Sequence, residues 1–473
     1  MNALRGSATV AVVSLGLLVA CRDDCCTPPP PPPPPSGVTI NGVVRDPIGE
    51  PISDAVVLVP GKGSDTTAAD GRFSIAGVIA PYDITVFVRS QNAVQIYKGL
   101  TRSDPIVDWW TGDAGPRQTA TISGTVPPAG PVTSVFFLGP HGGGIGNADP
   151  TTGQYSITVS WNGSATSNAG VLYLLRWQPA PVGDVGVVPA SYNGYASKPL
   201  TISAGGTSSG NDFAASDLTD PPEQSISVSV SVPAGYTLYS RALDLEFGGG
   251  HVRWVQVSQP LDIPLGIIPN PFTYTVPAIT GVVFGVYADA SASHAGWTHF
   301  FERNIPGNST GAVVPLEQPP HLLAPADSAT AIDATTLFSW SQGGGIGLNM
   351  FSVIPADTAN PRVYVHTSAA DATLPDLTGT GMSWPAGASY HWFVEREFPL
   401  ATVDDAAGTW YWDLNSRDYG WTTSTLYSFT TKAVAGAALR GPIVSASARG
   451  AEGLGRLHRS MLPPGLTVNG PER

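Results

Sequence analysis

Two short motifs contain residue types that take part in catalysis. His299 and Glu302 form a His-x-x-Glu pattern, a spacing at which two side chains can bind zinc. A catalytic zinc also needs a third protein ligand and an open coordination position. The flanking sequence is rich in β-formers, so we interpret the two as strand residues and predict no metal site. His141 precedes three glycines, a pattern that can aim backbone N–H groups at an oxyanion. We interpret this stretch as a flexible glycine loop and predict no catalytic residue.

A cluster of aromatic residues near the C-terminus is the candidate binding site. Five aromatic side chains lie within twelve residues, among Asp413, Arg417 and Asp418. Large apolar planes with polar neighbours can stack on a carbohydrate or anchor a protein partner. The alternative is that the segment folds over the edge of a domain and buries its rings. The candidate binding residues are Trp410, Tyr411, Trp412, Tyr419 and Trp421.

Other signatures of bound cofactors are weak. Asp65 and Asp70 lie near one turn and could hold calcium, but two carboxylates without further ligands are more typical of turn chemistry. The sequence has no Walker, EF-hand or dinucleotide-binding pattern. We therefore predict no cofactor and no enzymatic activity.

The overall composition is typical of short strands joined by tight turns. Glycine and proline make up 99 of 473 residues, and no segment beyond the N-terminal signal has convincing helical periodicity. The net charge is −13 and only 12% of residues are charged, which argues against nucleic acid and against an anionic membrane surface as partners. The sequence thus predicts an all-β protein.

The N-terminal residues resemble a bacterial lipoprotein signal peptide. Arg5 is followed by an apolar run too short to span a bilayer, and residues 18–21 read Leu-Val-Ala-Cys. The resemblance implies acylation of Cys21, which would attach the protein to a membrane through its lipid. Arg22, rather than aspartate, follows Cys21, which favours the outer membrane by resemblance to enteric sorting rules.

A stiff tether follows this anchor. Eight consecutive prolines at 28–35 predict a polyproline II rod of roughly 25 Å. The only other cysteines, Cys25 and Cys26, precede the rod, so the folded part has no disulfide. This pair could form a vicinal disulfide, cross-link two molecules or stay reduced.

The sequence of residues 37–117 predicts a compact β-sandwich. Its landmarks are a Gly-Val-Val-Arg-Asp stretch at 42–46, Gly-Glu-Pro-Ile at 49–52 and Asp-Gly-Arg-Phe-Ser-Ile at 70–75. These resemble a carboxypeptidase regulatory-like domain, a family of non-catalytic, seven-stranded, prealbumin-like sandwiches. In residues 118–217, related stretches recur at 124–126 and 152–157, both 82 residues later. This constant offset indicates a degenerate second copy.

Two more β-domains are expected. Residues 218–317 form a third sandwich with no family resemblance, containing a serine-alternating strand around Ile226 and a hairpin at the glycines 248–250. Residues 318–432 resemble a fibronectin type III or immunoglobulin-like sandwich, with Phe338, Trp340, Tyr390 and Trp392 in its strands. Residues 400–423 are expected to be an extra loop, and residues 433–473 a disordered tail.

These expectations combine into one functional hypothesis. The chain is a tandem array of β-sandwich domains, prealbumin-like and Ig/fibronectin-like, behind a lipoprotein signal peptide and a polyproline linker. We expect a non-enzymatic cell-envelope protein, membrane-attached at Cys21, that acts in binding, adhesion or scaffolding. The alternative is an accessory or degenerate carbohydrate-active hydrolase subunit that binds glycans.

Overall fold

The computed structural model describes residues 37–46, 49–88, 90–109, 116–128, 132–180, 188–248, 250–258, 268–292, 296–408, 417–433 and 466–467. The chain from Gly37 onward forms one compact unit. Among the described residues almost every regular element is a strand, with one short 3₁₀ helix at Ala215–Asp217 and one α-helix, α1, at Val403–Ala406. The predicted all-β class is confirmed.

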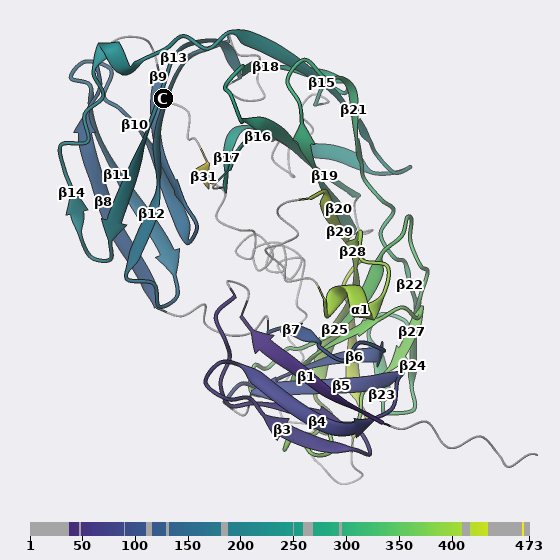
Figure 1. Ribbon diagram of the computed structural model, residues 1–473. Helices are drawn as coiled ribbons and strands as arrows, with labels where there is room; N and C mark the ends of the chain where they lie inside the picture. Colours follow the sequence, from purple (N-terminus) through teal and green to yellow (C-terminus); the bar gives the residue numbers. More distant parts are fainter. Residues whose placement is uncertain are drawn as a thin grey trace, which may run out of the picture. The chain divides into compact units, whose positions relative to one another are not determined.

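The first seven strands form a two-sheet sandwich, which we call module 1 (Figure 1). One sheet has the order β4-β1-β7, and the strands of the other follow one another as β3-β2-β5-β6. Buried and exposed residues alternate along β4 because one side faces the other sheet. The strands are β1 (Val38–Arg45), β2 (Ala55–Val59), β3 (Gly63–Thr66), β4 (Arg72–Val78), β5 (Tyr82–Val88), β6 (Ala93–Leu100) and β7 (Ile106–Asp108).

The next seven strands, module 2, repeat this order, but pairing of β10 with β11 joins them into one seven-stranded sheet. Gly42 pairs with Phe73 in module 1, and Gly124 pairs with Tyr155 in module 2, again 82 residues later. Gly71 and Gly153 take the same positive φ, 73° and 71°, and a Cβ on either would collide with the carbonyl oxygen of the facing strand. The strands are β8 (Arg117–Thr125), β9 (Val132–Gly139), β10 (Gly142–Asn147), β11 (Gln154–Asn162), β12 (Ser167–Pro179), β13 (Pro189–Ser203) and β14 (Thr207–Ser208).

Module 3 has the same strand order, although its sequence shows no family resemblance. Its sheets are β18-β15-β21 and β17-β16-β19-β20, and its first and last strands pair in parallel, as in the first two modules. The predicted hairpin is confirmed, because Phe247 pairs with Gly250. The strands are β15 (Glu223–Ser231), β16 (Thr237–Phe247), β17 (Gly250–Ser258), β18 (Phe272–Pro277), β19 (Val283–Ala292), β20 (Gly296–Ile305) and β21 (Thr310–Pro315).

Module 4 packs a three-stranded sheet, β22-β24-β27, on a larger one built around β26-β25-β28. Phe338 lies 5.1 Å from Trp392, ring centre to ring centre, in an edge-on contact between the sheets. The strands are β22 (Leu322–Ala324), β23 (Ala329–Ile332), β24 (Leu337–Trp340), β25 (Leu348–Pro355), β26 (Arg362–Thr367), β27 (Asp371–Thr373), β28 (Ser389–Phe398), β29 (Tyr419–Thr423) and β30 (Tyr427–Thr431).

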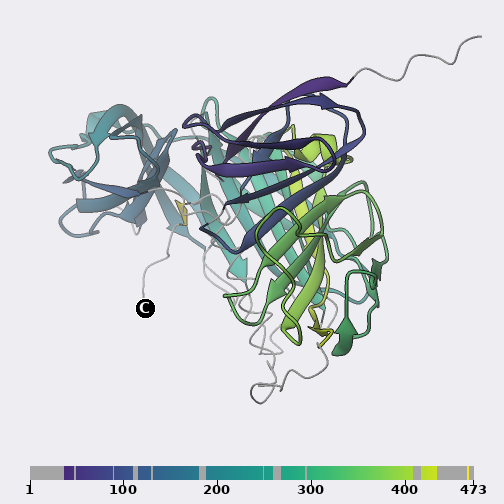
Figure 2. The same ribbon diagram turned by 90° about the horizontal axis from the view of Figure 1, so that it is seen from below.

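Three modules contribute to one continuous sheet, which we call the long sheet. Strand β6 of module 1 pairs in parallel with β26 of module 4 through five residue pairs, and we call this junction seam 1. Strand β29 of module 4 pairs with β20 of module 3 through five more, and this junction is seam 2. The strand order of the long sheet runs from β3 through β26 and β29 to β17. Figure 1 labels β28, β29, β20 and β19 in succession along this sheet, and Figure 2 gives a second view of the chain. The modules are therefore joined by backbone hydrogen bonds.

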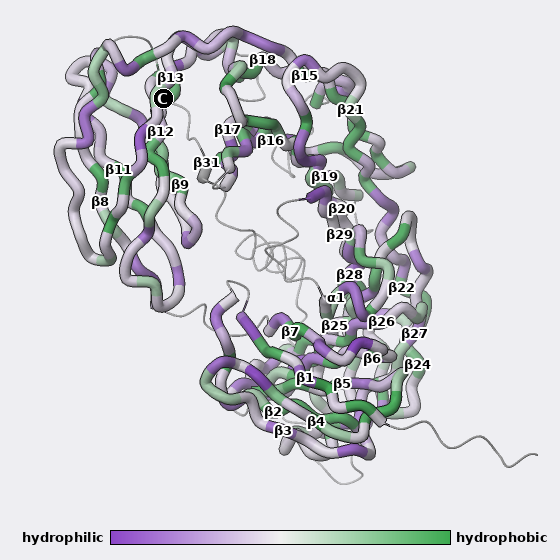
Figure 3. Tube along the Cα trace, viewed as in Figure 1, coloured by the Kyte–Doolittle hydropathy of each residue, from purple (hydrophilic) through white to green (hydrophobic). Residues whose placement is uncertain are grey.

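Module 2 is attached by side-chain packing instead. In strand β12 the residues from Leu172 to Trp177 are buried on both faces. Leu172 and Leu174 belong to the core of module 2, whereas Tyr173 and Trp177 pack against aromatic residues of module 3 such as Phe247 and Trp254. Hydrophobic residues, green in Figure 3, recur along the strands of the modules.

Two predicted irregular segments contain regular structure. The expected loop at 400–423 includes α1 and β29, and β29 forms seam 2. In the expected disordered tail, Leu466–Thr467 forms the short strand β31 beside β17. The rest of the tail from 434 onward, and the signal and tether before Gly37, lie outside the described residues.

Candidate functional site

The predicted aromatic site is only partly described. Trp410, Tyr411 and Trp412 lie outside the described residues. Tyr419 and Trp421 are in β29, and their side chains are 7% and 3% exposed. For these two residues the structure agrees with the alternative of buried rings, because β29 is an internal strand of the long sheet.

Trp421 and Tyr419 belong to a polar face of the long sheet. Side chains of residues that pair directly across a sheet lie on the same face. The pairs Asp289 with His299 and His299 with Trp421 therefore place these three side chains in one row over three strands. The neighbouring members of this face in module 3 are Asp244, Glu246, His251, Arg253, Tyr287, Phe301 and Arg303.

Ion pairs compensate the buried charges of this face. The Nε of Arg253 donates to Oδ1 of Asp244 at 3.1 Å, and Nη1 of Arg303 donates to Oε1 of Glu246 at 2.9 Å. Burial alone would raise the pKa of Asp244, but the Arg253 guanidinium holds it below its usual range. Burial raises the pKa of Glu246 despite Arg303. A buried ion pair that loses one partner leaves an uncompensated charge, so these pairs depend on each other.

A histidine–carboxylate contact lies beside these pairs. The Nδ1 of His299 contacts Asp289 and lies 2.9 Å from the hydroxyl oxygen of Tyr287. Its ring stacks on Trp421 with centres 4.6 Å apart. The Nε2 of His299 has no hydrogen-bond partner among the described residues. An aspartate–histidine pair can support a nucleophile, but no serine or cysteine hydrogen-bonds this ring within the described ranges.

The His-x-x-Glu pair does not converge. His299 pairs with Asp289 on the polar face, whereas Glu302 pairs with Val286, whose side chain belongs to the core on the opposite face. Successive residues of a strand point to opposite faces, so positions three apart diverge. Burial, and then the nearby carboxylate of Asp418, raise the pKa of Glu302 to about 7. The described part of the chain contains no group of three metal-ligating side chains.

The remaining motifs have structural roles. Gly142 begins β10, which forms a hairpin with β9 instead of the expected flexible loop. Asp65 accepts hydrogen bonds from the backbone N–H groups of Thr66 and Ser74, and Asp70 accepts one from Arg72. Asp70 lies in the turn before β4, which agrees with its interpretation as a turn residue, whereas Asp65 lies in strand β3 and pairs with Val57.

Two stretches also fit the Gly-x-Ser-x-Gly pattern of a nucleophile elbow, at 206–210 and 307–311. Ser208 ends the two-residue strand β14, and its hydroxyl accepts a hydrogen bond from Asn211. The hydroxyl of Ser309 donates to the carbonyl of Pro306. Neither serine contacts a histidine or starts a helix within the described residues, so neither forms such an elbow.

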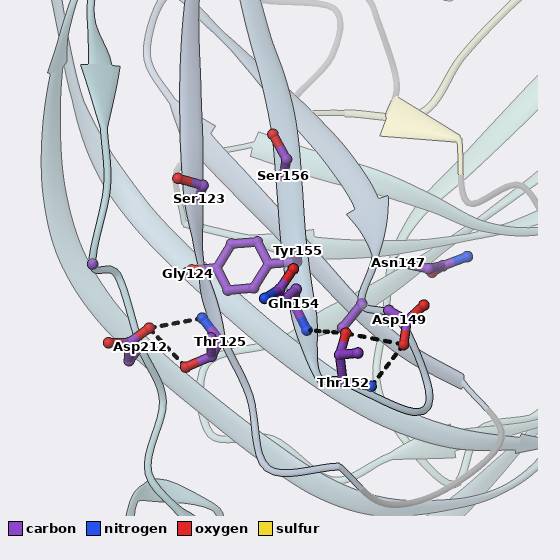
Figure 4. A pocket seen from close by; sticks show the side chains of 12 residues that line it. Ser123, Gly124, Thr125, Asn147, Asp149, Thr152, Gln154, Tyr155, Ser156 and Asp212 are labelled. Atoms are coloured by element: carbon purple, nitrogen blue, oxygen red, sulfur yellow. Dashed lines mark hydrogen bonds between the residues drawn. The ribbon is translucent and has the colours of Figure 1, made fainter.

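Module 2 has an open polar hollow of about 960 Å³ (Figure 4). Asp212 accepts hydrogen bonds from the backbone and hydroxyl of Thr125 at 2.7 and 2.8 Å, and these bonds lower its pKa. Asp149 is held in the same way by Thr151 and Thr152. Hydroxyl, amide and carboxylate groups that line the hollow could all bond to a polar ligand. Its lining includes Ser123, Asn147, Gln154, Tyr155 and Ser156.

No protein-family model matches the sequence, and no curated protein matches it. Among the solved structures that match, the Bacillus anthracis TIE protein is 10% identical with a TM-score of 0.14, over 59% of this chain and 50% of its own. The major pilin subunit BcpA of Bacillus cereus is 7% identical with a TM-score of 0.11, over 60% and 99%. A tetra-tandem repeat from the extending region of a large adhesion protein is 9% identical with a TM-score of 0.12, over 84% and 98%. This chain spans about half the length of the first of them.

No helix among the described residues is long and apolar enough to cross a membrane. The matched structures are at most 10% identical to this chain, and with TM-scores this low they support no inference about function. The chain itself is an all-β protein built of sandwich modules.

Proposed function

We propose that this protein is a non-enzymatic, lipid-anchored component of the cell envelope that works as a rigid binding, adhesion or scaffold array. The main support is the pair of seams. Each seam has five residue pairs, so modules 1, 3 and 4 share one hydrogen-bonded sheet. Modules that are joined by strand pairing cannot turn relative to one another without breaking the ladder, which buried backbone groups resist. Such an array keeps a fixed spacing between its surfaces.

The proposed partners are the membrane and a carbohydrate or a protein. The membrane contact is the lipid on Cys21, supported by the sequence at 18–21. Each buried methylene of an acyl chain contributes about 0.8 kcal/mol, so two or three chains anchor stably. The polar hollow of module 2 offers hydrogen-bonding groups for a carbohydrate. Residues 37–432 on a solid support, tested against a glycan panel and an envelope extract, would identify the partner class.

Membrane fractionation tests the anchor. Changing Cys21 to alanine should move the protein from the membrane pellet to the soluble fraction, because the lipid is its proposed attachment. The matched control changes Cys25 and Cys26 to alanine and should leave the protein in the pellet. If the Cys21 variant remained in the pellet after a high-salt wash, the lipid-anchor proposal would be wrong.

A further inference from the structure

Each seam contains a buried histidine stacked on an aromatic ring from the other module. At seam 1, His366 of β26 pairs with Tyr97 of β6, and the rings stack with centres 4.4 Å apart and planes 13° apart. At seam 2, His299 of β20 pairs with Trp421 of β29, and the rings stack at 4.6 Å. His366 is 2% exposed and His299 is 6% exposed. The two junctions thus use the same type of contact.

The two histidines differ in their charged neighbours. His299 contacts the carboxylate of Asp289, so a proton added to its ring would be paired with a negative charge. The Nε2 of His366 lies 3.0 Å from the amide nitrogen of Gln95, and its Nδ1 has no partner among the described residues. An amide N–H can donate to this ring only while Nε2 is unprotonated.

The surroundings of His366 give a positive charge little direct compensation. On β6 the facing groups are Gln95 and Tyr97, and on β25 the paired residue is Met350. Carboxylates occur on the elements beyond these neighbours. They are Asp108 on β7, Glu395 and Glu397 on β28, and Asp404 and Asp405 on α1.

We propose that seam 1 is an acid-sensitive joint: protonation of His366 breaks its bond with Gln95, places a charge between β6 and β26, and loosens module 1 from module 4. Seam 2 has a different arrangement, because His299 contacts the carboxylate of Asp289 and the hydroxyl of Tyr287, and it serves as the comparison. This inference concerns a conformational change and does not depend on the lipid anchor.

The direction of the pH effect follows from proton linkage. Burial lowers the pKa of His366 from 6.5 to about 3. At pH values between about 3 and 6.5, His366 therefore binds a proton more readily when the seam is open than when it is closed. As the pH falls below 6.5, the closed seam becomes less stable relative to the open one. At pH 5 the fraction of open seam should be about thirtyfold higher than at pH 7.5.

A second contact between the modules responds at lower pH. Asp404 accepts hydrogen bonds from the backbone N–H groups of Thr101 and Arg102, at 2.8 and 3.2 Å. Burial alone would raise the pKa of Asp404, but these bonds hold it below the usual range. Because the pKa of Asp404 lies below its usual range, this contact should persist between pH 7.5 and 5.

Hydrogen–deuterium exchange of the full chain tests the proposal. The amides of β6 and β26 that bond across seam 1 should exchange about thirtyfold faster at pH 5 than at pH 7.5, after correction for intrinsic rates. Amides of β20 and β29 should keep their protection. The variant His366→Gln, whose side chain is long enough to place an oxygen near the Nε2 position and cannot be protonated, should keep seam 1 protected at pH 5.

Two further variants make the outcome decisive. His366→Asn, which also cannot be protonated, serves as the second variant if the glutamine variant fails to fold. His391→Gln is the matched control, because His391 lies on β28 away from both seams and should leave the acid response of seam 1 unchanged. Equal loss of protection in wild type and in the folded His366 variant would overturn the proposal, and so would equal loss at both seams.

Discussion

Trp421 shows how one side chain can serve two modules. Its indole stacks on His299 of module 3 and lies 5.4 Å from the ring of Tyr419, while its backbone pairs with strands on both sides. Trp421 is buried, so it is not part of an exposed recognition surface of the kind that the nearby aromatic residues in the sequence suggested. We interpret Trp421 as a residue that stabilises seam 2.

Replacing Trp421 with alanine should therefore be strongly destabilising. Truncation of a buried aromatic side chain leaves a cavity and typically costs about 3–5 kcal/mol. Chemical denaturation followed by fluorescence and circular dichroism would measure the change in the free energy of unfolding. The control is Ile346→Ala, because Ile346 is 73% exposed and surface substitutions usually change stability by less than about 0.5 kcal/mol. Similar small effects for both variants would contradict the buried role of Trp421.

At the scale of elements, β29 is the strand that turns module 4 into part of a larger sheet. It pairs with β28 of its own module and with β20 of module 3. Gly420 makes this close approach possible, since a Cβ there would overlap the backbone oxygen of His299 and the ring of Phe300. The counterpart at seam 1 is β6, whose edge is covered by β26.

A fragment of residues 37–117 should fold alone but less stably than in the full chain. Its two sheets enclose buried side chains such as Ile40, Phe73, Ile84 and Val86, while the edge of β6 loses its partner. A thermal melt should show a cooperative transition. Addition of a fragment of residues 318–433, which supplies β26, should raise its midpoint, and addition of residues 118–217 should not. Absence of any transition would contradict independent folding, and equal effects of both fragments would contradict seam 1.

At the scale of the whole molecule, the modules are joined in two different ways. Modules 1, 3 and 4 share the long sheet, and buried residues of modules 1 and 4 form one hydrophobic cluster. Module 2 keeps its own seven-stranded sheet and its own core, and it adds to module 3 through the outer face of β9 and β12. Strand pairing and shared cores couple the unfolding of neighbouring domains.

Calorimetry of residues 37–473 should therefore detect fewer transitions than modules. We expect modules 1, 3 and 4 to unfold together at neutral pH, because separating them breaks both ladders. The Trp421→Ala substitution should lower the midpoint of this joint transition, including the signal from module 1. Independent transitions for modules 1 and 4 in the wild type would show that the seams contribute little to cooperativity.

The sequence by itself determined the features that depend on short-range patterns. Alternating residues predicted the buried face of β15, the glycines at 248–250 predicted the β16–β17 hairpin, and the 82-residue offset matches the identical pairing of Gly42 and Gly124. These signals are local because side-chain alternation and turn conformation depend on neighbouring residues. They were sufficient for the all-β class.

The tertiary structure decided the features that depend on distant partners. Gln95 and His366 are in contact although they are 271 residues apart in the sequence. Each seam consists mainly of strand pairing between backbone groups, which every residue type can provide. For the same reason the sequence did not reveal β29 as a strand, the second buried face of β12, or the shared strand order of module 3. Trp421 is buried because β29 pairs with β20 on one side and with β28 on the other. The strands that pair beside a residue decide whether its side chain is covered.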